Sequence, residues 1–518
     1  MTTSPTVFLI GAGPGDPGLI TVRGLECLQR ADVVLHDHLV SIRLLRRARP
    51  GAEIIDVGTA SPQPLAQEAI SLLIVEKARE GKSVARLKWG DPFVFDRGGE
   101  EALFLHGQNI PFEVVPGVPA GIATPAYAGV PITYPGGGDT ITFVRGYEDE
   151  SRTPVDIDWA SLSRLGGTVV CYAGAHQLPR VLDALQASGW PAEERAVAVY
   201  DGTLPSQETI AGTIGDLPAL VRERTRRGAA ILIVGRVTAF RDHLRWWDAR
   251  PLFGRRVLVT RPRDQAAELV DQLAAMGAEA IEAPMIRIEP PHDVGPLLEA
   301  AQASTTGAFD WIVFTSGNGV EAFMAALLDG SRDLRALGGV RLCAVGTGTA
   351  ERLARYGLKV DLVPREFRAD AVAATLAETS VLSRTRVLVP HGDIGREVVA
   401  DELRAGGAAV TDVIAYRTVL EDEQREGAPD IYRLLLDGTI DVVTFTSASA
   451  VRNFVKIYGE DQAPDLLKHT IVAAIGPVTA DAASQLGIEV SVQPSTFTVK
   501  ALVQAITDHF LATSAGKA

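Results

Sequence analysis

The segment Gly11-Ala12-Gly13-Pro14-Gly15-Asp16-Pro17-Gly18 directly follows an apolar run, residues 7–10, near the start of the chain. Such a short run is typical of a buried strand, and glycines allow the backbone to turn tightly behind it. Pro14 and Pro17 prevent an immediate helix, and Asp16 stands where a dinucleotide-binding loop carries its third glycine. A pyrophosphate site is therefore not expected, and by itself the segment could be only a connection between a strand and a helix.

Short apolar runs like the first one recur along the chain and alternate with helical patterns. In residues 66–79, Ala66, Ile70 and Ile74 share one face of a predicted helix, and Gly81 ends it. Continuous apolar runs are typical of parallel strands covered by helices on both faces, so the whole chain is predicted to be α/β. The runs that we interpret as strands are residues 7–10, 33–35, 84–87, 168–171, 231–234, 257–259, 312–314, 387–389 and 442–445.

Two further loops rich in glycine and proline follow predicted strands. Gly90-Asp91-Pro92-Phe93-Val94-Phe95 comes after residues 84–87, and Pro116-Gly117-Val118-Pro119-Ala120-Gly121 comes after residues 112–115. Open α/β sheets bind ligands at the carboxyl ends of their strands, and glycines there let the backbone approach a flat ligand closely. With the first loop, they predict one ligand site in the N-terminal half.

The composition is that of a globular protein, with 46% apolar and 22% charged residues, and 518 residues indicate several domains. A net charge of −14 disfavours nucleic acid and anionic membranes as partners. No apolar run is long enough to span a membrane, and no signal peptide is expected. Cys27, Cys171 and Cys343 stand alone, which predicts neither a disulfide framework nor a metal site. A reducing cytoplasm is the expected compartment.

Seven stretches of the N-terminal half form an ordered set: residues 11–17, 37–40, 87–95, 97–101, 115–117, 125–131, and 202–203 with Gln207. In this set the half resembles the tetrapyrrole methyltransferases, most closely uroporphyrinogen-III C-methyltransferase, over about residues 5–248. The resemblance implies two α/β subdomains with S-adenosylmethionine between them. It also implies a homodimer formed through this half.

Site residues of the first half follow from the resemblance position by position. Asp37 matches an acidic residue implicated near the substrate, although it could instead be a helix cap. The implied reaction is in-line transfer of a methyl group from a sulfonium to a pyrrole carbon, for which the protein positions both molecules and accepts a proton. The residues expected around S-adenosylmethionine are Pro14, Trp89, Gly90, Asp91, Val94, Pro119, Ala120, Ala173 and Gly202.

The half also departs from the family pattern. A glycine is usual where Trp89 and Asp96 stand, and a methionine is usual at Ala173. A Thr-Ser or Thr-Ala pair is usual at Pro119-Ala120. Trp89 could replace the missing methionine by packing on the cofactor, or it could fill the site. The family's basic Gly-Lys-Arg stretch, with the residue that follows it, appears here as Gly58-Thr59-Ala60-Ser61.

The clearest domain boundary lies near residues 244–255, where one periodic region ends and a new strand starts at Val257. Trp246 and Trp247 in this connection predict a packed segment and not a loose linker. We therefore divide the chain into domains 1–248 and 254–518.

The second domain contains an internal repeat. Residues 257–260 recur as residues 387–390, an offset of 130, and Phe314-Thr315-Ser316 recurs as Phe445-Thr446-Ser447, an offset of 131. Val345-Gly346 likewise recurs as Ile475-Gly476. The repeat predicts a pair of similar α/β domains around a cleft, where ligands usually bind.

Four predicted helix starts in the repeat offer free N–H groups and hydroxyls to an anion: residues 315–318, 346–349, 446–449 and 476–479. Each could equally be a simple helix cap. With residues 257–262 and 415–418, this ordered set resembles uroporphyrinogen-III synthase over about residues 254–512. The resemblance implies cyclisation of hydroxymethylbilane without a cofactor.

Tyr416 matches the tyrosine thought to assist departure of the substrate hydroxyl, and a phenol is a plausible proton donor for that step. A buried strand tyrosine is the alternative. His391 is interpreted as structural. The residues expected to bind substrate carboxylates are Ser316, Thr349, Ser447 and Thr479, with Arg261 and Arg396 as further charge partners.

Together the resemblances imply a bifunctional enzyme of tetrapyrrole biosynthesis whose C-terminal half makes the substrate of its N-terminal half. The alternative is an active synthase with a degenerate or regulatory methyltransferase-like module. An NAD-dependent oxidoreductase would rest on Gly11 and Gly13 alone, and Asp16 with the prolines disfavours it. Sirohaem and cobalamin both stay open as the downstream product.

Overall fold

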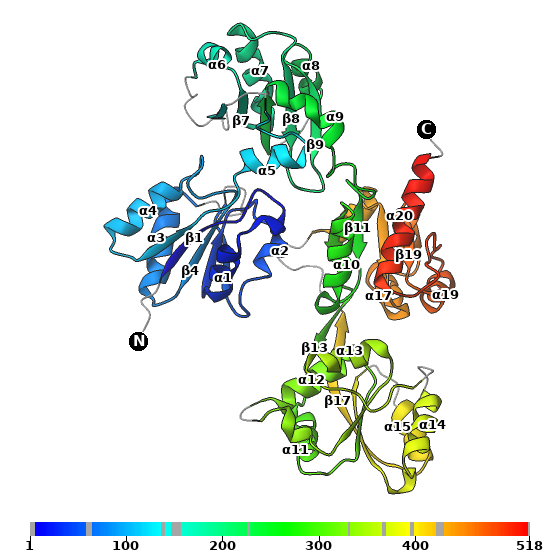
Figure 1. Ribbon diagram of the computed structural model, residues 1–518. Coiled ribbons are helices and arrows are strands. Elements are labelled where there is room, and N and C mark those ends of the chain that lie inside the picture. Colours follow the sequence, from blue (N-terminus) through cyan, green and yellow to red (C-terminus); the bar gives the residue numbers. More distant parts are fainter. Residues whose placement is uncertain are drawn as a thin grey trace. The chain divides into compact units, whose positions relative to one another are not determined.

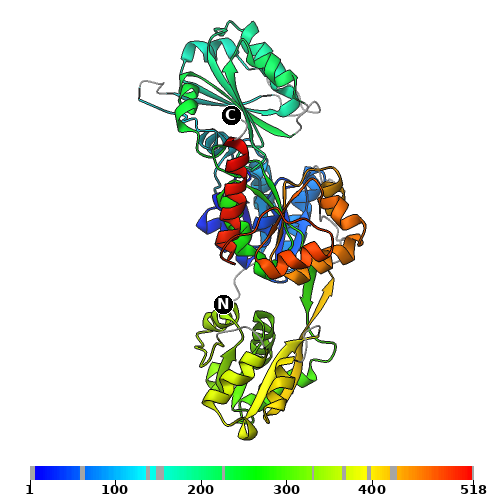
Figure 2. The same ribbon diagram turned by 90° about the vertical axis from the view of Figure 1, so that its right-hand side faces the viewer.

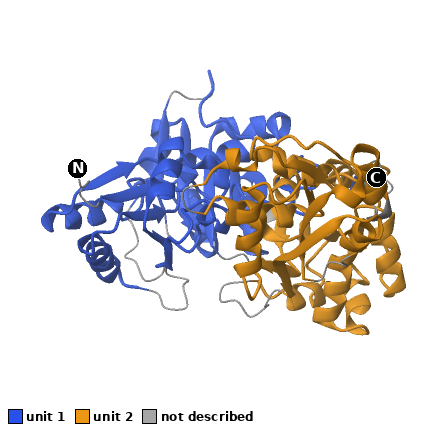
Figure 3. Ribbon diagram, turned by 90° about the horizontal axis from the view of Figure 1, so that it is seen from below, with its two compact units in different colours: residues 1–255, 273–279, 510–518 blue, residues 256–272, 280–509 orange. Residues whose placement is uncertain are grey.

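The computed structural model describes residues 6–58, 65–135, 140–146, 157–224, 228–329, 332–364, 369–393, 398–420 and 429–515. The chain forms two compact units, one of residues 1–255, 273–279 and 510–518, and the other of residues 256–272 and 280–509 (Figure 3). Both units are α/β, as predicted (Figure 1). None of the described helices is both long and apolar enough to cross a membrane.

The first sheet of the first unit has the strand order β3-β2-β4-β1-β5, and all its paired strands are parallel. Alternate strand residues enter two separate cores: Leu9 and Leu35 pack on the side of α3, and Ile10 and Val34 pack on the side of α1. The elements are β1 (Val7–Gly11), α1 (Val22–Arg30), β2 (Val33–His36), α2 (Ile42–Leu45), β3 (Glu53–Asp56), α3 (Gln67–Arg79), β4 (Val84–Lys88), α4 (Gly98–Gly107) and β5 (Phe112–Val115).

The second sheet of this unit, β6-β7-β10-β8-β9, is mixed and departs from the predicted parallel pairing, as does the antiparallel pair of β13 (Ile286–Glu289) and β17 (Ala409–Leu420) in the other unit. Only residues 201–207 separate β8 from β9. A connection between parallel strands needs a dozen residues or more, so these two strands pair antiparallel. Its elements are α5 (Ala120–Tyr127), β6 (Ile141–Arg145), α6 (Trp159–Leu165), β7 (Thr168–Gly174), α7 (Leu178–Ala187), β8 (Arg195–Tyr200), β9 (Glu208–Thr213), α8 (Leu217–Arg222), β10 (Ala229–Val234) and α9 (Arg241–Leu244).

The segment after α9 is packed, as its tryptophans predicted. The indole N–H of Trp246 donates to the Ala126 carbonyl at 2.8 Å, and that of Trp247 donates to the Leu204 carbonyl at 3.2 Å. The Trp247 ring also lies 4.7 Å from the Tyr127 ring and carries the Arg250 guanidinium 4.2 Å from its centroid. The aromatic contacts fix this segment to the end of α5.

The second unit contains two sheets of related order, β12-β11-β18-β19 and β13-β17-β16-β14-β15. The strands are β11 (Arg256–Val259), β12 (Glu279–Glu282), β13 (Ile286–Glu289), β14 (Trp311–Phe314), β15 (Arg341–Ala344), β16 (Arg386–Gly392), β17 (Ala409–Leu420), β18 (Val442–Phe445) and β19 (Ile471–Ala474). The helices that lie wholly or mainly in this unit are α10 (Arg263–Ala275), α11 (Gly295–Ser304), α12 (Gly317–Leu327), α13 (Thr347–Arg355), α14 (Ala369–Thr379), α15 (Val398–Ala405), α16 (Ile431–Leu436), α17 (Ala448–Tyr458), α18 (Gln462–Leu467), α19 (Pro477–Gln485) and α20 (Val499–Ala515).

The two copies of the repeat form two similar lobes, but neither lobe consists of one copy. Strand β11 of the first copy pairs with β18 of the second, and β16 of the second copy pairs with β14 of the first. The copies are thus interleaved, and the chain crosses between lobes twice. An antiparallel ribbon of β13 and β17, with Ile286 opposite Leu420, carries these crossings (Figure 2).

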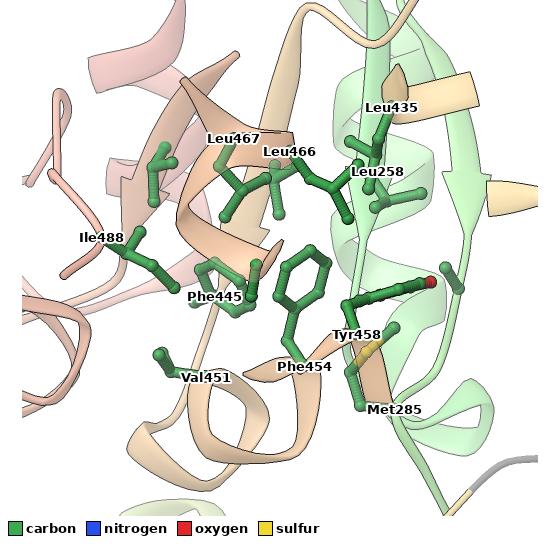
Figure 4. Packing of buried hydrophobic residues seen from close by; sticks show 14 of the residues in the cluster. Leu258, Met285, Leu435, Phe445, Val451, Phe454, Tyr458, Leu466, Leu467 and Ile488 are labelled. Carbon is green, nitrogen blue, oxygen red and sulfur yellow. The ribbon is translucent and has the colours of Figure 1, made fainter. Parts of the chain in front are cut away.

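An aromatic pair marks the equivalent position in each lobe core. Phe445 and Phe454 lie edge to face with centroids 5.5 Å apart among Leu258, Met285 and their neighbours (Figure 4). Phe314 and Phe323 are 5.5 Å apart in the same arrangement in the other lobe. The repeat therefore extends from the strand sequence to the packing of the strand on its following helix.

Candidate functional sites

Three glycine-rich loops of the first unit touch each other through their backbones. Gly13 and Gly90 exchange hydrogen bonds, since the Gly13 N–H donates to the Gly90 carbonyl at 3.2 Å and the Gly90 N–H donates to the Gly13 carbonyl at 2.9 Å. A Cβ on Gly117 would lie 2.3 Å from the Gly90 oxygen and 2.6 Å from the Gly11 Cα. Only glycine allows this approach, so the loops form one continuous backbone surface.

Asp91 fixes the shape of two of these loops. One carboxylate oxygen accepts the Phe93 N–H at 2.8 Å, and the other accepts the Gly117 N–H at 2.9 Å. The side chain is buried, with 9% of its surface exposed. Both oxygens are therefore engaged within the protein, and Asp91 serves the site by holding the loops.

The start of α5 belongs to the same place. Pro119 occupies the cap position of the helix, Ala120 is buried, and the Gly121 N–H donates to the Tyr172 hydroxyl at 2.7 Å. Burial raises the pKa of Tyr172, which keeps the phenol protonated. The Trp89 side chain packs on the cluster that contains Ala120 and Tyr172.

A fourth loop, after β8, closes against the first. A Cβ on Gly202 would lie 2.3 Å from the Thr124 hydroxyl oxygen. Thr203, held at a φ of 74°, accepts the Asp16 N–H at 3.0 Å. Its own N–H donates to the Gln207 side-chain oxygen at 2.9 Å. Gly202, Thr203 and Gln207 thus hold the loop after β8 against the first glycine loop and α5.

The structure gathers most of the residues predicted to surround a cofactor. The loops just described carry Pro14, Trp89, Gly90, Asp91, Val94, Pro119, Ala120 and Gly202. Ala173 is different, because successive residues of a strand face opposite sides of the sheet. Tyr172 faces the Trp89 cluster, whereas the Ala173 side chain enters the core on the other side, so only its backbone could contribute. Residues 59–61 of the altered basic stretch lie outside the described part.

Asp37 lies at the carboxyl end of β2 and is held on both oxygens. One accepts from the Arg86 guanidinium at 2.5 Å, and the other accepts the Trp89 N–H at 3.0 Å. Burial alone would raise the pKa of Asp37, but the charges of Arg86 and Lys88 and the hydrogen bond from Trp89 hold it below its usual value. The carboxylate is thus anionic, and about a quarter of the side chain is exposed (24%).

A buried group of charges supports Asp37 from beneath. Arg86 and Lys88, both almost fully buried in β4, each lie 3.2 Å from the same oxygen of Glu101. Lys88 also lies 3.2 Å from Asp96. Burial and the charge of Asp37 raise the pKa of Asp96, and Lys88 opposes the rise. The sequence contained one signal of this network, which is two cations inside an otherwise apolar strand.

In the second unit, two equivalent serines follow equivalent strands. The Ser316 hydroxyl accepts the Gly319 N–H at 3.1 Å, and the Ser447 hydroxyl accepts the Ala450 N–H at 3.2 Å. Both therefore cap their helices, which was the structural alternative. A role in binding would be additional to the capping role.

Tyr416 reaches the Ser316 cap from β17. The two hydroxyl oxygens are 3.1 Å apart. The phenol ring lies against Gly392, where a Cβ would come within 2.7 Å of the ring carbon Cζ. The half-buried ring is fixed by this contact, and its hydroxyl is directed to the carboxyl end of β14.

The remaining predicted substrate residues divide between the lobes. Thr349 is buried in the first turn of α13, in the lobe of Ser316 and Tyr416, and Thr479 is buried in the first turn of α19, in the lobe of Ser447. Arg261 follows β11 in that same lobe. Arg396 lies outside the described residues. Within the described ranges, no group of His, Cys, Asp and Glu could hold a metal ion.

Comparison with known proteins gives one family match for each half. The family of Tetrapyrrole (Corrin/Porphyrin) Methylases matches residues 6–218, and the family Uroporphyrinogen-III synthase HemD matches residues 267–504. The chain is 35% identical over 483 residues to the Porphyrin biosynthesis protein HemD of Ruminiclostridium josui, covering 93% of this chain and 94% of that protein.

Other relatives match parts of the chain. It is 34% identical to the Uroporphyrinogen-III C-methyltransferase of Bacillus subtilis (strain 168), over 69% of this chain and 73% of that protein. It is 42% identical to a Siroheme synthase of Pseudomonas paraeruginosa over 47% of this chain, and it spans about half of that relative (52%).

Solved structures from Thermus thermophilus are similar to each half. A uroporphyrin-III C-methyl transferase complexed with S-adenyl homocysteine is 34% identical, with a TM-score of 0.39, over 45% of this chain and 99% of that one. A mutant uroporphyrinogen III synthase is 20% identical, with a TM-score of 0.38, over 50% of this chain and 99% of that one.

Proposed function

The chain belongs to the tetrapyrrole methylase family in its N-terminal half and to the uroporphyrinogen-III synthase family in its C-terminal half, and from this we propose its two reactions. It is a bifunctional enzyme of tetrapyrrole biosynthesis. Domain 254–518 cyclises hydroxymethylbilane to uroporphyrinogen III. Domain 1–248 methylates that product with S-adenosylmethionine to give precorrin-2.

The observation that carries the proposal is the presence of both families on one chain, with a relative similar over nearly the full length of each protein. The test is incubation of the purified chain with hydroxymethylbilane and S-adenosylmethionine, followed by mass spectrometry of the products and chromatography of the isomers, which share one mass. We expect dimethylated precorrin-2. Unmethylated uroporphyrinogen III alone would reject the methyltransferase assignment, and absence of the type III isomer would reject the synthase assignment.

The glycine loops of the first unit support a site for the adenosyl donor, because their backbones pack so closely that a Cβ on Gly11 or Gly117 would lie within 2.6 Å of the backbone of a neighbouring loop. Bound there, S-adenosylmethionine supplies an activated methyl group. The residues of this chain orient it, with Pro14, Pro119, Ala120 and Gly202 on neighbouring loops and Asp91 holding two of them. Positioning of this kind removes much of the entropic barrier to transfer.

We assign Asp37 as the group that receives the proton lost from the methylated ring system. Its carboxylate is anionic, since its pKa is held low, and it is partly exposed at the strand end where the loops meet. A carboxylate of low pKa is a weak base, so its contribution depends on exact placement next to the proton. The residues that hold Asp37 therefore bear on the rate of transfer.

In the synthase domain we assign Tyr416 as the donor of a proton to the departing hydroxyl of hydroxymethylbilane. Ser316 lies within hydrogen-bond distance and orients the phenol. The hydroxyls of Ser447, Thr349 and Thr479, with Arg261 and Arg396, are proposed to bind the carboxylates of the substrate. Helix N-termini favour such anions. The reaction as proposed uses no cofactor.

A second candidate is a synthase with a methyltransferase-like regulatory module. It is favoured by one observation, that Trp89 packs on the cluster of Ala120 and Tyr172. Calorimetry with S-adenosylmethionine separates the two candidates, because a filled site would bind none. We further propose a homodimer formed through domain 1–248, acting in the cytoplasm, and sedimentation of the full chain tests the dimer.

A further inference from the structure

We propose that Arg86 is a positioning residue for methyl transfer, which holds the Asp37 carboxylate in the orientation that receives the proton. The inference rests on the proposed function of the N-terminal half. It concerns a side chain that lies almost entirely within the protein, with 2% of its surface exposed, and so cannot itself touch the substrate from solvent.

The guanidinium of Arg86 is directed at three acceptors at once. One terminal nitrogen donates to Asp37 at 2.5 Å, Nε donates to Glu101 at 3.2 Å, and the other terminal nitrogen donates to the Leu87 carbonyl at 3.4 Å. A planar guanidinium has its donors in a fixed fork, so anchoring two of them fixes the direction of the third. The third is the one that holds Asp37.

Glu101 is the anchor of this arrangement. It is fully buried, and its Oε1 atom accepts from Arg86, from Lys88 and from the Gln67 side chain, at 3.2, 3.2 and 3.0 Å. Its other oxygen has no hydrogen-bond partner within the described residues. A buried carboxylate needs cations nearby, and the two cations of β4 supply them.

The arrangement fixes the orientation of the Asp37 carboxylate. Its two oxygens are occupied from inside by Arg86 and from the loop by the Trp89 N–H, so rotation of the carboxylate would break one of these hydrogen bonds. Each oxygen keeps a second lone pair for a proton. As the methyl group bonds to the ring carbon, the carbon–sulfur bond breaks, its electron pair stays on sulfur, and the ring system loses one proton to Asp37 and then to water.

The test compares Arg86→Lys with a matched exchange elsewhere. Lysine keeps the charge but has a single nitrogen, which cannot reach Asp37 and Glu101 in the same geometry. We expect kcat for methyl transfer to fall about tenfold or more, with KM for both substrates within about twofold, because only placement of the base is lost. Arg23→Lys is the control, since Arg23 makes an exposed bidentate pair with Glu113 at 2.8 Å, and it should leave the rate unchanged.

The pH profile and a double variant separate positioning from a folding defect. The hold of Arg86 lowers the pKa of Asp37, so its loss should move the acid limb of the methyl-transfer profile to higher pH. In the Asp37→Asn background, Arg86→Lys should cost nothing further, as expected of residues that act as one unit. Unchanged affinity for S-adenosylmethionine, measured by calorimetry, is the folding control for the unit that contains Arg86.

If Arg86→Lys does not fold, Glu101→Gln gives the second variant, because it weakens the anchor and should lower kcat with the same dependence on Asp37. Normal turnover of both variants, together with a strong loss in Asp37→Asn, would overturn the inference while leaving the proposed function intact. Normal turnover of Asp37→Asn would overturn the role of Asp37 and the inference with it. Absence of methyl transfer in the unaltered chain would instead reject the proposed function.

Discussion

The hydroxyl oxygen of Tyr416 lies 3.1 Å from the hydroxyl oxygen of Ser316, one hundred positions earlier in the chain. The serine caps α12 through the Gly319 N–H, and so the phenol is tied to the first turn of a helix. This places the phenol, which we propose as the proton donor for the departing hydroxyl group, at a helix start where anions are favoured.

Replacing Tyr416 with Phe should slow ring closure by a factor on the order of 10², the usual range for loss of a general acid. The product should shift toward the type I isomer, which forms spontaneously from released hydroxymethylbilane. Chromatography of the isomers after timed incubation measures both effects. Tyr432→Phe, at an exposed tyrosine of α16, is the matched control. An unchanged rate and isomer ratio would remove Tyr416 from the mechanism.

Gly117→Ala should abolish binding of S-adenosylmethionine and spare the synthase. The new Cβ would lie 2.3 Å from the Gly90 oxygen, which is backbone and cannot move away cheaply. Gly107→Ala is the control, because nothing lies within 4 Å of that position at the end of α4, and alanine should stabilise the helix by about 0.5–1 kcal/mol. Calorimetry of both variants tests the prediction, and retained affinity in Gly117→Ala would contradict it.

Asp37→Asn should destabilise the first unit at neutral pH, because Arg86 would lose one partner of its buried pair. The folded-state pKa of Asp37 is lowered, so its stabilising contribution is present above the unfolded value of about 3.9 and is lost as the pH falls through the folded value. The difference in Tm from the parent should therefore be largest near pH 7 and shrink in acid. A difference that grows in acid would have the wrong sign.

A fragment that contains only the first repeat copy, residues 254–385, should not fold. Its β11 would lack β18 and its β14 would lack β16, so both would be exposed as unpaired edges. Circular dichroism and hydrogen exchange against the full chain measure this. A cooperative unfolding transition of the fragment would mean that one copy can form a lobe alone.

Phe323→Ala and Phe454→Ala should have similar costs, about 3–5 kcal/mol each, because the two rings occupy equivalent positions in the two lobe cores. Denaturant unfolding monitored by synthase activity would compare them. A large cost in one lobe and none in the other would show that the lobes do not share their packing.

Much of the fold and of the candidate sites could be predicted from the amino acids alone. The glycine loops, the apolar strand runs and the serine caps are local patterns, each encoded within a short window, and the repeat shows itself because such windows recur at an offset of about 130. The packed Trp246-Trp247 connection was predicted for the same reason, since two indoles need partners.

Other features depend on contacts between distant parts of the chain. The repeat predicted two lobes but not their interleaving. Arg256 and Asp441, 185 positions apart, make contact only because β11 of the first copy pairs with β18 of the second. The side of the sheet that Ala173 faces depends on the register in which β7 pairs with β10, and a shift of one residue would turn it to the other side. The contact of Arg86 with Asp37 joins neighbouring strands of a buried sheet. The local sequence thus determined the helices, strands and loops. The tertiary structure determined which strands pair and where buried charged side chains such as Arg86 point, because both depend on burial and on contacts between distant parts of the chain.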